Sequence, residues 1–162
     1  VDPPHAITGI TGRKNYTVIS LTKAHSSAEI GFLRKVLQIF EKYNVSIEAV
    51  PVTVDTYSIV VQTHLINHCL YEIIGELKET VHPEDIRVED HQAMIAVVGR
   101  EMKQRAGISG QLLSEFGRNK INIRTISQSS YELTIMIGVS DNDFEKSIKA
   151  IYEKFVAEEK KQ

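Results

Sequence analysis

The sequence contains an internal repeat with an offset of 76 residues, which becomes 78 residues at the last helix. Residues 31–33 (Gly-Phe-Leu) align with residues 107–109 (Gly-Ile-Ser), and residues 45–47 (Val-Ser-Ile) align with residues 121–123 (Ile-Asn-Ile). One ungapped offset over so long a stretch is typical of two copies of one supersecondary unit. Since 162 residues are enough for two small domains, the repeat predicts two domains of the same fold.

Hydrophobic periodicity predicts the elements of the first copy. Apolar residues spaced by three and four indicate one face of a helix, whereas short β-branched stretches indicate strands. The two helical stripes are Leu33, Val36, Leu37 and Phe40, then Leu70, Ile73, Ile74 and Leu77. Strands are predicted over residues 16–22, 45–54, 57–62 and 86–88. The order of elements is therefore βαββαβ.

The second copy follows the same order but lacks its last strand. Strands are predicted over residues 93–99, 121–128 and 133–139, and helices over residues 107–117 and along Ile148, Ile151, Tyr152 and Phe155. An unpaired sheet edge is costly, so we expect residues 6–10 to supply the missing strand. Residues 11–14 would then link the two copies, and Glu89 and Asp90 would form a polar turn between them.

These elements predict an α+β fold of two ferredoxin-like βαββαβ domains. Each domain would have a four-stranded antiparallel sheet with helices on one face. The first domain is expected over residues 15–90, inserted into a second domain made of residues 5–12 plus 91–157. Residues 158–162 are expected to form a charged, solvated tail.

Composition argues against several functional classes. A formal net charge of -2 and a pI of about 6.3 indicate no basic face for nucleic acid. RNA-binding domains share the βαββαβ order but need exposed aromatic residues, and residues 58–61 (Ser-Ile-Val-Val) have none. No apolar run approaches a membrane span. The single cysteine, Cys69, suits a reducing cytoplasm, where we expect the protein.

No group of side chains indicates catalysis by this chain. Residues 9–14 (Gly-Ile-Thr-Gly-Arg-Lys) lack the spacing of a phosphate-binding loop, and residues 107–110 lack the nucleophile-elbow pattern. His64 and His68 could clasp a metal from one helix face, beside Cys69, but no second pair of ligands has metal-like spacing. We therefore expect no catalytic residue, metal or cofactor here.

The turn between the first strand and the first helix is the best candidate for a binding site. A helix N-terminus offers free N–H groups that favour a carboxylate, and Gly31 allows a ligand close to the backbone. Glu29 and Glu48 could receive an ammonium group, so this site suits a free amino acid. In the alternative interpretation, Ser26 or Ser27 only caps the helix and both acids are solvated.

Several phrases of the sequence resemble the C-terminal regulatory region of aspartate kinases, which carries a tandem of ACT domains. In the first half they are residues 10–17 (Ile-Thr-Gly-Arg-Lys-Asn-Tyr-Thr), 31–33 (Gly-Phe-Leu) and 44–48 (Asn-Val-Ser-Ile-Glu). In the second half they are residues 98–102 (Val-Gly-Arg-Glu-Met), Asn122 with Ile123, and residues 127–130 (Ser-Gln-Ser-Ser). The resemblance covers nearly the whole chain, from about His5 to Phe155.

The resemblance implies an allosteric role. The parent enzyme would phosphorylate the side-chain carboxylate of aspartate with ATP, the first step toward lysine, threonine and methionine. Its kinase domain, with ATP and Mg, would lie N-terminal to Val1. The ACT pair would bind lysine, threonine or both as feedback inhibitors and would associate as a homodimer through its sheets. The charged C-terminal end favours a monofunctional kinase.

The resemblance also implies effector contacts. In the first domain these are Ser26, Glu29, Ile30, Gly31, Phe32, Leu33, Ser46, Ile47, Glu48 and Thr53. In the second domain Asn122, Ile123 and Gln128 occupy comparable positions, but Arg124 replaces Glu48. We therefore expect the first domain to bind the effector and the second to serve mainly in association. Residues 28–30 (Ala-Glu-Ile) depart from the hydroxyl-bearing stretch of lysine-sensitive members, which leaves the effector open.

Two further interpretations remain at this stage. The chain could be a dimerisation domain without a ligand, in which case no amino acid would change its melting temperature. It could also be an ACT sensor belonging to another amino-acid enzyme or standing alone.

Overall fold

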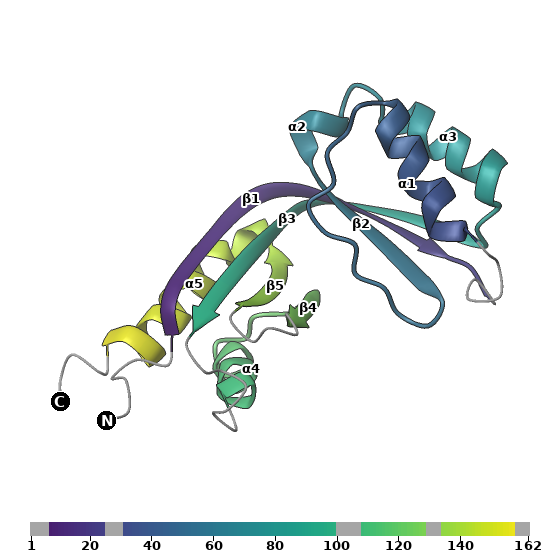
Figure 1. Ribbon diagram of the computed structural model, residues 1–162. Coiled ribbons are helices and arrows are strands. Elements are labelled where there is room, and N and C mark those ends of the chain that lie inside the picture. Colours follow the sequence, from purple (N-terminus) through teal and green to yellow (C-terminus); the bar gives the residue numbers. More distant parts are fainter. Residues whose placement is uncertain (1–6, 25–30, 100–107, 129–133, 158–162) are drawn as a thin grey trace. The chain divides into compact units, whose positions relative to one another are not determined.

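The computed structural model describes residues 7–24, 31–99, 108–128 and 134–157 (Figure 1). The chain divides into two compact units. Residues 15–91 form the inserted unit, and residues 1–14 with residues 92–162 form the discontinuous unit.

The strands form an antiparallel arrangement. β1 (Ile7–Thr22) pairs with β2 (Thr56–Gln62). β5 (Thr134–Ser140) pairs with both β3 (Asp85–Gly99) and β4 (Thr125–Gln128). The order across the sheet is β2-β1-β3-β5-β4. This antiparallel sheet, together with its helices, confirms the predicted α+β class.

The strand count differs from the prediction, because the structure has one five-stranded sheet instead of two separate four-stranded sheets. β1 and β3 are single long strands with one part in each unit. Residues 11–14, predicted as a link, belong to β1, and Glu89 and Asp90, predicted as a turn, belong to β3. Glycine and charged residues favour turns locally, but pairing of backbone N–H and C=O groups with a neighbouring strand outweighs that preference.

In the inserted unit, α1 (Phe32–Lys42) and α3 (Leu70–Val81) lie side by side against the sheet, and the short helix α2 (Thr63–Ile66) precedes α3 (Figure 1). Alternate strand residues point toward these helices. Ile19 of β1 lies opposite Ile59 of β2, and both are fully buried with Leu77 of α3. Burial of this apolar surface holds the helices on the sheet.

The buried face of α1 differs from the predicted stripe. Leu33 and Leu37 are only partly buried. The buried residues of α1 are Phe32, Val36, Ile39 and Phe40. The core-facing side of the helix is therefore rotated toward Phe32 and Ile39, relative to the stripe that spacing alone predicts.

The predicted strand over residues 45–54 is not continuous. This segment makes two isolated bridges with β2, from Ala49 to Val60 and from Val52 to Tyr57. Pro51 lies between them and has no N–H to donate, which disfavours a regular strand. The corresponding strand of the second copy, β4, is also shorter than the predicted 121–128.

In the discontinuous unit, α4 (Ile108–Arg118) packs near α5 (Phe144–Tyr152). A 3-10 turn (Asp141–Asp143) precedes α5 and a π-helix (Glu153–Ala157) follows it. The buried cluster of this unit includes Ile7 from the first part of β1, together with Ile95 and Ile137. No helix in the described ranges is long and apolar enough to cross a membrane.

Candidate functional site

The N-terminus of α1 begins at a glycine with left-handed backbone. Gly31 has φ 82° and ψ 11°, and its carbonyl accepts the first intrahelical bond, from Lys35 N at 3.0 Å. A Cβ at Gly31 would meet nothing closer than Arg34 Nε at 3.8 Å, so conformation and not space calls for glycine here. The first turn of α1 contains no acidic residue, which leaves the positive end of the helix dipole uncompensated by its own side chains.

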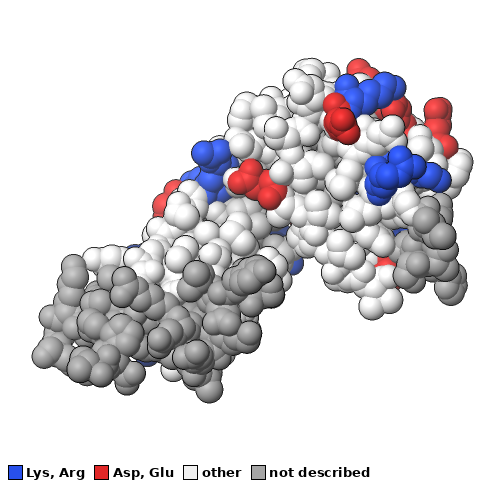
Figure 2. Space-filling model, viewed as in Figure 1, with Lys and Arg blue, Asp and Glu red and all other residues white. Residues whose placement is uncertain are grey.

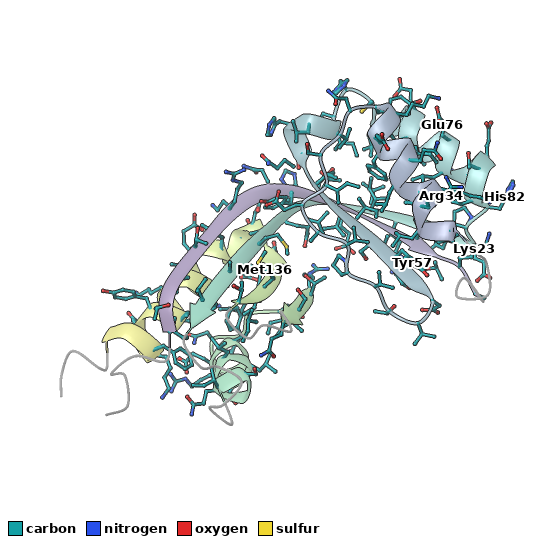
Figure 3. The ribbon with its side chains drawn as sticks, in the orientation of Figure 1. Lys23, Arg34, Tyr57, Glu76, His82 and Met136 are labelled. Atoms are coloured by element: carbon teal, nitrogen blue, oxygen red, sulfur yellow. The ribbon has the colours of Figure 1, made fainter. Side chains whose placement is uncertain are left out.

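The side chain of Phe32 supports this helix start from inside. Its ring is 2% exposed and lies 4.9 Å from the Tyr57 ring, centroid to centroid. Lys23 Nζ lies 5.4 Å from the Phe32 centroid and donates to the Val81 carbonyl at the end of α3. Figure 3 shows Lys23, Arg34 and Tyr57 near this end of α1. Phe32 can therefore offer a ligand its backbone but not its ring.

The segment after α1 holds three of the predicted site residues. Asn44, with φ 56°, ends the helix, and Val45 N donates to Phe40 O at 3.0 Å. Ser46 and Glu48 are exposed, while Ile47 is half-buried. Glu48 N donates to Val60 O at 2.8 Å, which ties the backbone of this segment to β2 and leaves the carboxylate in solvent.

Two adjoining hollows connect the helix with this segment. A hollow of 490 Å³ lies along α1, and a second of 250 Å³ lies between the end of α1 and residues 44–47. Both are lined by Leu37 and Glu41. The first is also lined by Leu33, Arg34 and Gln38, and the second by Asn44, Val45, Ser46 and Ile47. The structure thus brings the predicted residues Leu33, Ser46 and Ile47 to one surface.

Sequence reasoning missed six residues of that surface, which are Arg34, Leu37, Gln38, Glu41, Asn44 and Val45. Leu37 was assigned to the apolar stripe of the helix. Spacing cannot separate a core leucine from a half-buried one on a helix that is apolar over a wide arc. Arg34 and Glu41 lie close in sequence to Leu33 and Leu37, and these charged residues are the sequence signal that could have indicated an outward face.

The remaining predicted residues lie elsewhere or outside the described residues. Thr53 lies in the turn before β2, where its N–H donates to Thr56 O at 2.9 Å, and it lines neither hollow. Ser26, Glu29 and Ile30 fall outside the described residues.

The second copy repeats the geometry that follows the helix. Lys120 has φ 57°, and Ile121 N donates to Phe116 O at 2.9 Å, as Val45 N donates to Phe40 O in the first copy. Asn122 and Gln128 are exposed and Ile123 is half-buried. Arg124 N donates to Gly138 O at 2.7 Å. The backbone framework is thus shared, while the charge at the position of Glu48 is reversed.

A polar cluster fixes the end of α1 to α3. Glu76 Oε1 accepts hydrogen bonds from Lys42 Nζ at 2.5 Å and from Tyr43 Oη at 2.6 Å. The bond from Lys42, followed by that from Tyr43, lowers the pKa of Glu76. The hydrogen bond to Glu76 raises the pKa of Tyr43 to about 12. Tyr43 directly precedes Asn44, so this cluster positions the start of the 44–48 segment.

Metal ligation has little support in the described part of the chain. It contains no group of three or more His, Cys, Asp or Glu side chains that could hold a metal ion. His64 lies on α2, whereas Cys69 is the N-cap of α3 and is buried. Burial, and then the charge of Glu72, raises the pKa of the Cys69 thiol. On the face drawn in Figure 2, positive and negative side chains are interspersed.

Comparison with known proteins agrees with this fold. Residues 95–155 match the family model of the ACT domain. Aspartokinase 3 of Bacillus subtilis is 30% identical over 152 residues, which cover 93% of this chain and 34% of that protein. The chain thus spans about a third of the length of this relative.

Three solved structures share the fold. Clostridium acetobutylicum aspartate kinase has a TM-score of 0.89 at 40% identity, covering 92% of this chain and 34% of that one. A putative C-terminal regulatory domain of aspartate kinase from Porphyromonas gingivalis has a TM-score of 0.74 at 20% identity. The match covers 93% of this chain and 99% of that one. Escherichia coli aspartokinase III, in complex with lysine and aspartate, has a TM-score of 0.78 at 18% identity. The match covers 96% of this chain and 34% of that one.

Residues 95–155 therefore match the ACT domain, a ferredoxin-like α+β module with which the antiparallel sheet and helices agree. The particular resemblance of the chain is to the regulatory region of aspartate kinases, as the sequence predicted, and the similarity extends over both units.

Proposed function

We propose that this chain is the allosteric regulatory region of an aspartate kinase and that its two units are tandem ACT domains. The first would comprise residues 15–90, and the second residues 5–12 plus 91–157. Three observations support this: the 76-residue repeat, the division into an inserted and a discontinuous unit, and the ACT match within the second of them.

The parent protein would phosphorylate the side-chain carboxylate of aspartate with ATP. The chain spans only about a third of its relatives, so the kinase domain, with its ATP and Mg, would belong to the rest of such a protein. The role proposed for this chain is regulation, in the cytoplasm.

The effector would be a free amino acid, lysine or threonine, bound by the inserted unit. The observation that carries this proposal is the left-handed Gly31 at the start of α1, two residues before Leu33, which lines the hollow along that helix. The N–H groups of the first turn suit the effector carboxylate. Glu48 suits its ammonium group, because its backbone is fixed and its side chain is exposed. Lysine in the E. coli structure of the same fold supports this class of ligand.

Inhibition would follow from population shift. The discontinuous unit, with Arg124 at the position of Glu48, would contribute mainly to association within a homodimer. An effector that prefers one packing of the ACT domains stabilises that packing by its difference in affinity for the two states. The kinase loses activity if that packing disfavours its active conformation.

Isothermal titration of the chain with lysine, and separately with threonine, tests the proposal. We expect one of them to bind and Glu48→Ala to weaken binding by about 10- to 100-fold, the range for loss of a charged hydrogen bond. Glu79→Ala, an exposed acid on α3, serves as the matched control. Absence of heat with both amino acids, with no change in melting temperature, would favour the dimerisation domain. Binding that Glu48→Ala leaves unchanged would refute the assigned site.

A further inference from the structure

Three side chains tether the end of α1 to α3. Glu76 lies where α3 runs beside α1 (Figure 3), and its Oε1 accepts hydrogen bonds from Lys42 Nζ at 2.5 Å and from Tyr43 Oη at 2.6 Å. Lys42 Nζ also lies 5.5 Å from the centroid of the Tyr43 ring, so one cation contacts both the carboxylate and the ring. These three residues are here called the Glu76 tether.

The equivalent residues of the discontinuous unit bond within their own helix instead. The 76-residue offset places Lys42 on Arg118, and it places the next residue, Tyr43, on Asn119. Arg118 Nη2 donates to Glu115 Oε1 at 2.5 Å, and Asn119 Nδ2 donates to the Glu115 carbonyl at 2.8 Å. Glu115 belongs to α4 itself, so these bonds do not join α4 to α5. Bonds from these two positions to the second helix are therefore specific to the inserted unit, where we place the effector site.

The Glu76 tether holds the segment that leads to Glu48. Tyr43 is the C-cap of α1, and the left-handed Asn44 follows it directly. Further along, Glu48 N donates to the Val60 carbonyl of β2 at 2.8 Å. Residues 44–47, which line the 250 Å³ hollow, are therefore held by α3 at one end and by β2 at the other. A movement of Tyr43 changes the shape of that hollow.

The last turn of α1 depends on the same anchor. Asn44 N donates to the Glu41 carbonyl at 2.9 Å, and Val45 N donates to the Phe40 carbonyl at 3.0 Å. Helix ends fray where side chains do not fix them. The bond from Tyr43 to α3 opposes that fraying. The segment is thus ordered before a ligand arrives, which removes part of the entropy cost of binding.

We propose that Glu76 is a positioning residue of the effector site, which fixes residues 44–48 through Tyr43 and thereby sets the affinity for the effector. Glu76 belongs to α3 and lines neither hollow, so it acts through the Glu76 tether and not by contact with the ligand. This inference rests on the proposed function and adds α3 to the parts that control it. The effector and the tether favour the same arrangement of the segment, so each strengthens the other.

Amide hydrogen exchange of the whole chain, read residue by residue by NMR, tests the positioning without any effector. We expect Tyr43→Phe and Glu76→Ala to speed exchange of the Glu48 amide about fivefold, the factor that corresponds to one hydrogen bond. Glu76→Gln keeps a carbonyl oxygen as acceptor and should leave the exchange rate within about twofold of the wild type. Glu79→Ala removes an exposed acid from the same helix and should have no effect.

Two other amides of the same samples serve as references. Ile73 N donates to the Cys69 carbonyl at 3.0 Å within the inserted unit, and Arg124 N occupies the repeat-related position of Glu48 in the discontinuous unit. Neither should change in the variants. Equal acceleration at Glu48 and Ile73 would mean that the bond only stabilises the unit as a whole, and that result would overturn the proposal.

Isothermal titration with lysine and with threonine then measures the effector Kd of the same variants. Tyr43→Phe and Glu76→Ala should each raise the Kd about fivefold, and the double variant should bind no more weakly than Glu76→Ala alone, because both changes break one bond. Glu76→Gln and Glu79→Ala should bind like the wild type. Variants that all bind like the wild type would overturn the role of Glu76 and leave the proposed function intact. A wild-type chain that binds neither amino acid would overturn the proposed function, and this role with it.

Discussion

Asn44 and Lys120 lie 76 residues apart and share the same left-handed backbone, with φ of 56° and 57°. Each follows the last turn of a helix, and each has an N–H that donates to the carbonyl three residues earlier, Glu41 in one copy and Gly117 in the other. The repeat is therefore preserved in backbone hydrogen bonds, although the side chains at this position differ. Asparagine tolerates this conformation better than lysine does.

Lys120→Gly should stabilise the protein by about 1 kcal/mol, because glycine adopts positive φ without steric cost. Urea denaturation monitored by circular dichroism measures the change. Lys146→Gly provides the opposite control, since Lys146 is an exposed residue within α5, where glycine should cost about 1 kcal/mol. A destabilising effect at Lys120 would show that its side chain makes contacts that outweigh the strain.

Gly31→Ala should destabilise the inserted unit by about 1–2 kcal/mol, because alanine at φ 82° is strained although space is available. Gly75→Ala is the matched control, as Gly75 lies within α3 and a Cβ added there would meet nothing within 4 Å, so alanine should stabilise by about 1 kcal/mol. Denaturation midpoints of the two variants should move in opposite directions. Equal shifts would contradict the conformational explanation.

Gly12→Ala should destabilise the discontinuous unit by about 1–3 kcal/mol through overpacking. A Cβ at Gly12 would lie 2.6 Å from Phe144 Cε2 and 3.1 Å from the Met94 carbonyl oxygen. At Gly9, on the same strand, the nearest atom is Val98 Cβ at 4.0 Å, so Gly9→Ala should be tolerated. Thermal melting separates the two variants, and similar melting temperatures would argue against close packing of β1 on Phe144.

The bond between Tyr43 and Glu76 should make stability depend on pH at both ends of the scale. The folded state lowers the pKa of Glu76, so its contribution is present above the unfolded value of about 4.3 and is lost as the pH falls through the folded pKa. The folded state raises the pKa of Tyr43. The contribution of Tyr43 to stability is therefore complete below a pH of about 10, the unfolded pKa, and is lost as the pH rises toward about 12.

Melting temperatures of wild type and Tyr43→Phe across pH measure these effects. The variant should melt at a lower temperature near neutral pH, and the difference should shrink at strongly acid pH. Titration of tyrosinate absorbance in the variant should also lose the group whose pKa is raised to about 12. A difference that does not vary with pH would mean that the lost packing of the hydroxyl, and not its bond to Glu76, sets the stability.

Much of the fold follows from local patterns. The apolar spacing around Ile73 and Leu77 predicted a buried helix face, and the short β-rich stretch over residues 16–22 predicted a strand. Both are properties that neighbouring residues determine among themselves. The resemblance to aspartate kinase regulatory regions rested on short phrases in a fixed order, and the comparisons confirm it.

The candidate site was less accessible to sequence reasoning. Spacing placed Leu37 in the core, because a helix with a wide apolar arc offers no local sign of which edge of the arc faces outward. Phe32 was expected to contact a ligand, but its ring packs against Tyr57, a partner 25 positions away in the chain. The contacts of Glu48 with an effector stay a prediction until binding is measured.

The sequence by itself determined the repeat, the places of the main helices and the α+β class, because these depend on periodicity within short segments. Only the tertiary structure decided that residues 11–14 and residues 89–90 continue long strands, where local composition indicated a link and a turn. It also decided which side of α1 faces the sheet. The physical reason is the same in each case: the outcome depends on a partner distant in sequence, a neighbouring strand or a facing core, whose pairing and burial outweigh local preference.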